Sequence, residues 1–134
     1  MTTTTDDWEH ARESALATFE CIDELFAKVD EHDDDQEAQD AVYEELREMP
    51  LSLLVRGDWV EPGQESKPTE FELLMGTGGP AVRIRGDLNE YGEPTRAYIQ
   101  AQDWATPWFD VFPVRMGFGA VLLRFAGLFY YGEG

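Results

Sequence analysis

The chain has 134 residues, with 28 Asp and Glu against 10 Lys and Arg, and a formal net charge of −18. Such a chain does not bind nucleic acid or an anionic membrane by general electrostatics, because both attract clustered cationic side chains. Its 43% hydrophobic content exceeds that of disordered chains. We therefore expect one folded domain, residues 1–134, that contacts neither nucleic acid nor a membrane directly.

The cysteine content and the ends of the chain bear on its location. Cys21 is the single cysteine and cannot form an internal disulfide, and residues 1–7 lack the basic and apolar regions of a secretory signal. The longest apolar stretch, 116–131, is interrupted by Arg124 and three glycines and is too short to span a membrane. The sequence predicts a cytoplasmic protein.

Residues 7–30 have the periodicity of an amphipathic helix, with apolar side chains at three- and four-residue spacing. At 100° per residue these apolar positions occupy an arc of roughly 80°, and five glutamates fall within about 60° on the opposite side. These glutamates, which we call the acidic stripe, are Glu9, Glu13, Glu20, Glu24 and Glu31.

A second helix is predicted over about 35–48, where Val42 and Leu46 share one face and Pro50 follows the end. The two helices form an acidic helical hairpin, and residues 1–50 hold 17 acidic and 3 basic side chains, net −14. Residues 51–134 carry only −4. Further exposed carboxylates are expected at Asp33, Asp34, Asp35, Glu37, Glu44 and Glu48.

From residue 51 the pattern changes to short β-branched and aromatic runs separated by Gly and Pro, typical of an antiparallel meander. Val82 and Ile84 alternate with Arg83 and Arg85, which indicates one packed and one wetter sheet face. We expect an α+β domain in which the helical hairpin, 1–50, covers a four-stranded sheet in 51–134. The predicted strands are 51–56, 70–75, 81–85 and 96–101; 104–109 is an aromatic loop, and 119–130 is a short helix or a strand.

The sequence offers no convincing catalytic group, metal cluster or cofactor motif. His10 and His32 lie in the acidic helical region without zinc-ligand spacing, and Cys21 borders the apolar face as a small packed thiol. A calcium-loop pattern that begins at Asp33 has Ala38 where such loops need glycine. The segment 76–80 is interpreted as a hairpin turn rather than a phosphate loop. We expect a protein that is not an enzyme and binds no metal or cofactor.

The acidic stripe is the sharpest feature, since Glu9 to Glu31 spans about 33 Å of helix at ~1.5 Å per residue. Like charges at this spacing destabilise a helix, whereas a protein with a basic groove would gain from carboxylates placed like phosphates. Adaptation to high salt also fits, because only Lys28 and Lys67 are lysines, as does a solvated face without a partner. The net charge changes from −14 in residues 1–50 to −4 in residues 51–134, which favours an acidic face directed at a partner.

Three segments carry a resemblance to known proteins: 73–88 (LLMGTGGPAVRIRGDL), 102–108 (QDWATPW) and 129–133 (FYYGE). Through these motifs, the segment 50–134 resembles a family of small, mostly uncharacterised proteins that are found on bacterial plasmids and phages. With its acidic first part, the chain also resembles anti-CRISPR proteins of mobile genetic elements. Some of those are DNA mimics that occupy the DNA-binding surface of a Cascade-type effector.

These observations lead to one favoured hypothesis, a non-enzymatic inhibitor that binds the basic surface of a host defence complex, with a type I CRISPR effector favoured. The acidic stripe and the six further carboxylates are the expected contacts. The same face would also suit an immunity- or antitoxin-like protein that binds a basic toxin. A salt-adapted domain with a small-ligand pocket around Trp104 and Trp108, using Asp103, is a further alternative.

Overall fold

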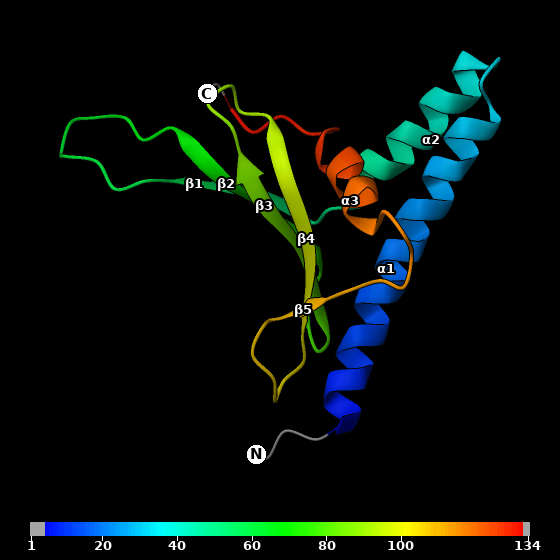
Figure 1. Cartoon of the computed structure of the whole chain (residues 1–134), viewed down its shortest axis with the longest axis horizontal. Helices are drawn as coiled ribbons and strands as arrows, with labels where there is room; N and C mark the ends of the chain where they lie inside the picture. Colours follow the sequence, from blue (N-terminus) through cyan, green and yellow to red (C-terminus); the bar gives the residue numbers. More distant parts are fainter. Residues whose placement is uncertain (1–4, 133–134) are drawn as a thin grey trace.

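The computed structural model describes residues 5–132 and has the expected α+β architecture, two N-terminal helices followed by an antiparallel sheet and a C-terminal helix (Figure 1). Residues 1–4, part of the segment judged to lack a secretory signal, and Glu133 of the last motif lie outside the described residues. The helices are α1 (Thr5–Glu31), α2 (Gln36–Glu48) and α3 (Phe118–Ala126). The strands are β1 (Ser52–Gly57), β2 (Pro68–Gly76), β3 (Ala81–Leu88), β4 (Pro94–Gln102) and β5 (Phe109–Val111).

The sheet has five strands in the order β1-β2-β3-β4-β5, each antiparallel to its neighbour, so the meander is confirmed but the prediction of four strands is wrong. The additional strand, β5, begins at Phe109, the last residue of the predicted aromatic loop, and places Asp110 opposite Gln100. Three residues are too few to show alternation in a sequence, which is why this strand was missed.

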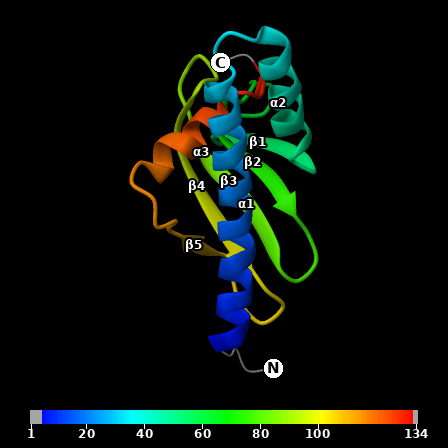
Figure 2. The same cartoon turned by 90° about the vertical axis from the view of Figure 1, so that its right-hand side faces the viewer.

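One face of the sheet is covered by helices, and α1 runs across it in front of the strands in Figure 2. The second covering element is α3, which packs on β4, whereas α2 packs mainly against α1. The expectation that the hairpin as a whole covers the sheet is therefore wrong for α2. Segment 119–130, for which periodicity left helix or strand open, contains the helix α3 up to Ala126.

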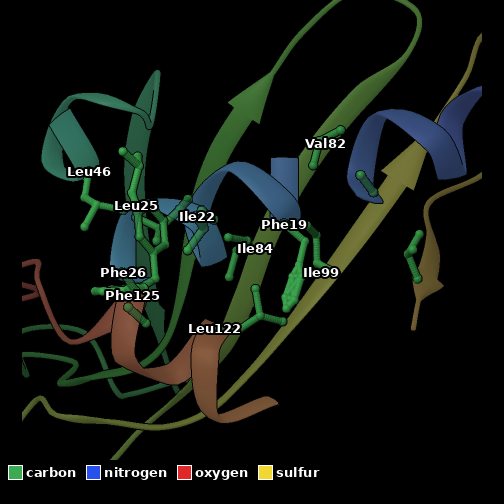
Figure 3. Close-up of a cluster of buried hydrophobic side chains, with 14 of the residues drawn as sticks. Phe19, Ile22, Leu25, Phe26, Leu46, Val82, Ile84, Ile99, Leu122 and Phe125 are labelled. Carbon is green, nitrogen blue, oxygen red and sulfur yellow. The ribbon is translucent and has the colours of Figure 1, made fainter. Parts of the chain in front are cut away.

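The hydrophobic core lies between the sheet and these helices, and Figure 3 shows its central side chains. It is formed by the apolar face of α1, the inner side of α2, alternate residues of the strands and one face of α3. Because α1 buries this face, the opposite side of the helix must point into solvent. Cys21 of α1 is also exposed, so the expectation of a packed thiol is wrong. The fully buried large side chains are Ile22, Leu46, Phe71, Leu73, Ile84, Ile99, Leu122 and Phe125.

Close packing around Gly86 and Phe71 connects the sheet to Tyr131, near the C-terminal end of the described residues. A Cβ at Gly86 of β3 would collide with the carbonyl oxygen of Arg96 and the ring of Phe71, so only glycine fits there. The Phe71 ring lies 4.8 Å from that of Tyr131, whose hydroxyl donates a 2.7 Å hydrogen bond to the carbonyl of Ala126. Burial raises the pKa of Tyr131 above its ordinary value of 10.0, so this hydroxyl stays a donor even at alkaline pH.

Candidate protein-binding face

All five glutamates of the acidic stripe are exposed in the structure. The reason is the helical period: Ala15, Phe19 and Ile22, on the other side of α1, are at most 2% exposed. The stripe extends for about 33 Å along an unbroken helix of 27 residues. Its carboxylates form a linear array on the surface that faces away from the sheet.

Ion pairs distinguish the acidic stripe from the other carboxylates of α1. Asp23 lies 2.7 Å from Arg115, and Asp30 lies 3.1 Å from Arg124, so two cations from the C-terminal part neutralise carboxylates beside the stripe. The hydrogen bond with Asp30 also raises the pKa of Arg124. Within the described part of the chain, none of the five stripe glutamates forms an ion pair. The array is left to solvent or to a partner.

The six further carboxylates, in the α1–α2 turn and on α2, are also exposed. Asp35 has a structural role, because it is the N-cap of α2 and its carboxylate accepts a 3.1 Å hydrogen bond from the Ala38 amide. Gln39 donates to the Val29 carbonyl at 3.0 Å and ties α2 to α1. The calcium-like pattern is thus a helix start. No group of three metal-ligating side chains occurs among residues that the structure describes.

The uncovered face of the sheet is also charged, but there the charges are balanced. Its polar side chains alternate along the strands with buried core residues, so they share the face remote from α1. The Glu72 carboxylate accepts from Arg83 at 3.2 Å and lies 3.4 Å from Arg85. The four arginines and four carboxylates of this network are Arg56, Arg83, Arg85, Arg96, Glu70, Glu72, Asp87 and Asp110.

The pKa values in this network reflect its contacts. The hydrogen bond from Arg56 lowers the pKa of the Glu70 carboxyl. Burial, together with the neighbouring Arg85, lowers the pKa of Arg83. The Arg83 guanidinium stacks 4.0 Å from the centre of the Trp108 ring and donates to Gln100 at 2.7 Å. These contacts tie Arg56, Arg83 and Arg85 to side chains of the sheet.

The residues considered for a small-ligand pocket have different contacts in the structure. Asp103 is buried in its own turn, where it accepts a 2.7 Å hydrogen bond from the Trp104 amide and lies 3.4 Å from His10 of α1. Trp104 is 81% exposed and its indole lies against Gly79 in the β2–β3 turn. Trp108 faces Arg83 instead. The turn at 76–80 joins β2 to β3, as predicted for a hairpin.

A second feature of the face was not predicted: an apolar loop beside the acidic stripe. Residues 112–116, which we call the apolar loop, connect β5 to α3 and expose Phe112, Val114 and Met116 by 71%, 103% and 97%. Apolar residues in a sequence usually predict burial, so nothing in the sequence indicated that these side chains are exposed. Arg115 of the loop contacts Asp23 of α1, so the loop lies beside this helix (Figure 1).

No protein-family model, curated protein or solved structure matches this chain. Among the residues described, no helix is both long and apolar enough to cross a bilayer.

Proposed function

We propose that this protein is a non-enzymatic inhibitor that presents the acidic stripe to the basic, nucleic-acid-binding surface of another protein and so excludes the nucleic acid. One observation carries the proposal: five exposed glutamates line one side of α1, and among the described residues none of them is neutralised by an ion pair. The chain pairs Asp23 and Asp30, on one flank of the stripe, with arginines, whereas the five stripe glutamates form no ion pair among the described residues.

The chemistry of the stripe supports this reading. Lys and Arg side chains that normally contact phosphates also form charge-assisted hydrogen bonds with carboxylates. A linear array of carboxylates therefore competes for such a groove, and its field speeds association with a positively charged surface. The stripe destabilises its own helix through like-charge neighbours, and binding to a cationic partner removes that repulsion.

The favoured target is a type I CRISPR effector, on the basis of the resemblance to acidic anti-CRISPR proteins. The acidic residues of α2 and of the turn before it, Asp33, Asp34, Asp35, Glu37, Glu44 and Glu48, extend the contact surface beyond α1. The target is a protein, and the inhibitor itself touches neither nucleic acid nor membrane.

The test is inhibition of DNA binding by a purified type I effector, measured by the mobility shift of a labelled target duplex. The variant Glu13→Lys, Glu20→Lys, Glu24→Lys reverses the middle of the acidic stripe. We expect its inhibitory potency to fall more than about 100-fold, because three attractive contacts become repulsive. Inhibition by the unaltered protein should also weaken as salt rises from about 0.1 M to 0.5 M.

A control variant separates the position of the charges from their sum. Glu61→Lys, Glu65→Lys, Glu90→Lys makes the same change in net charge at three exposed sites in loops of the sheet region. We expect it to inhibit as well as the unaltered protein. Equal potency of the two variants refutes the assigned face, and failure of the unaltered protein to inhibit refutes the type I effector as the target.

A further inference from the structure

We propose that the binding face continues from the acidic stripe into an apolar contact site, formed by α1 and the apolar loop, which receives a bulky apolar side chain beside the partner's basic groove. This inference rests on the proposed function and specifies the partner's chemistry: a cationic surface with an aliphatic or aromatic residue projecting next to it. The stripe alone would fit any sufficiently basic protein, whereas the added site selects among them.

The apolar loop is held in place although its side chains are exposed. Pro113 is buried, and the Arg115 guanidinium forms the 2.7 Å ion pair with Asp23 of α1. The carbonyl of Arg115 accepts a 3.1 Å hydrogen bond from the Phe118 amide at the start of α3. The Phe112 ring packs edge-on against that of Phe118, 6.4 Å between centres. A fixed backbone therefore presents Val114 and Met116 to solvent.

A hollow separates this loop from α1. It has a volume of about 390 Å³ and is lined by Leu16, Phe19, Glu20 and Asp23 of α1 and by Pro113, Val114 and Arg115 of the loop. Four of these lining residues are apolar, and the ion pair between Asp23 and Arg115 contributes two charged ones. Glu20 belongs both to the hollow and to the acidic stripe, so the apolar site and the charged array are contiguous.

The arrangement has the anatomy of a specific protein interface. Such interfaces bury an apolar centre inside a polar or charged rim, and a few apolar anchors in pockets dominate the dissociation rate. DNA offers its binding protein phosphates but no fixed apolar pocket of this kind. Three exposed apolar residues within five positions lie beside a hollow that Glu20 of the acidic stripe lines, and among the described residues Glu20 forms no ion pair. This combination points to a cationic protein rather than to small ions as the occupant.

The test compares dissociation rates from an immobilised type I effector. Val114→Ser with Met116→Ser removes two side chains that are almost fully exposed, so the fold does not depend on them. We expect dissociation to accelerate by about tenfold at both low and high salt, with the association rate within about twofold of the original. The charge-reversed stripe variant should instead slow association, chiefly at low salt.

The matched control is Trp59→Ser with Tyr91→Ser, which removes larger exposed apolar side chains from the β1–β2 loop and the β3–β4 turn. We expect it to dissociate like the unaltered protein. If the Val114/Met116 variant also does so while the stripe variant loses binding, the apolar site is refuted and the proposed function stands. Absence of binding by the unaltered protein refutes the target and the site together, and equal acceleration by both double variants refutes a localised site.

Discussion

The outer face of α1 and the uncovered face of the sheet carry similar numbers of carboxylates but treat them differently. On the sheet, Glu72 holds Arg83 and Arg85 within 3.4 Å, and Gln100 donates to Asp110 at 2.9 Å. On α1 the five stripe glutamates have no ion-pair partner within residues 7–132. Folding thus gives the carboxylates of the sheet their partners, whereas it gives the stripe glutamates no ion pair among the described residues.

This difference separates carboxylates that are paired within the fold from carboxylates that are left to solvent or to a partner. A chain that needed only hydration would gain by spreading carboxylates over every surface, yet this chain balances four arginines with four carboxylates on the sheet. Asp23 and Asp30, on one flank of the stripe, are paired with arginines 92 and 94 positions away in the sequence. Two cations are thus placed beside the stripe and pair with aspartates rather than with its glutamates.

The largest stability effect should come from breaking the sheet network. In Glu72→Ala the partly buried Arg83 and Arg85 lose their shared carboxylate and are left facing each other. We expect the free energy of unfolding, from urea denaturation, to fall by about 1–3 kcal/mol. Glu24→Ala on the stripe is the matched control and should change it by less than about 0.5 kcal/mol. Similar losses in both variants would remove the distinction between the two faces.

A smaller effect, of opposite sign, is expected from neutralising the stripe. Glu13→Gln, Glu20→Gln, Glu24→Gln relieves the repulsion within the pairs Glu9–Glu13 and Glu20–Glu24 without changing helix propensity much. At low salt the free energy of unfolding should be higher than that of the unaltered protein by between a few tenths of a kcal/mol and about 1 kcal/mol. Added NaCl should reduce this difference. A loss of stability in this variant would mean that the stripe glutamates support the fold.

The smallest effect concerns pH and the exposed Arg56–Glu70 pair. The hydrogen bond from Arg56 holds the pKa of Glu70 below its ordinary value of 4.5, so the pair stabilises the fold above that pH and loses its effect as pH falls through the lowered pKa. Solvent screening keeps the gain small. Glu70→Gln should therefore melt slightly below the unaltered protein at pH 7, and at the same temperature near pH 3. A difference in melting temperature between the two proteins that increases as the pH falls would contradict this prediction.

The helices and most strands could be predicted because their periodicity reflects burial on one side. The face of α1 that buries Ala11, Ile22 and Val29 is the face with apolar residues at three- and four-residue spacing. Strand β5 could not be predicted, because three residues show no period. The packing of α3 on the sheet could not be predicted either, because the sequence of an apolar helix does not specify which surface it covers.

For the candidate site, the exposure of the stripe could be predicted from the same helical period. That its glutamates form no ion pair with any other described residue could not. The ion pairs of Asp23 with Arg115 and of Asp30 with Arg124 join distant parts of the chain and depend on how α3 is placed. The exposure of Val114 and Met116 is also a tertiary property, because the local sequence is the same whether another part of the chain covers the loop or not. The function itself rests on the tests above.

The separation of a bare anionic helix from a balanced sheet has one more consequence. Residues 1–50 carry −14, and the four arginines and four carboxylates of the opposite surface cancel, so the centre of negative charge is displaced from the centre of mass toward the helices. The molecule consequently has a large permanent dipole. In the field of a cationic surface it experiences a torque that turns α1 forward before any atoms touch, so productive encounters are selected during diffusion.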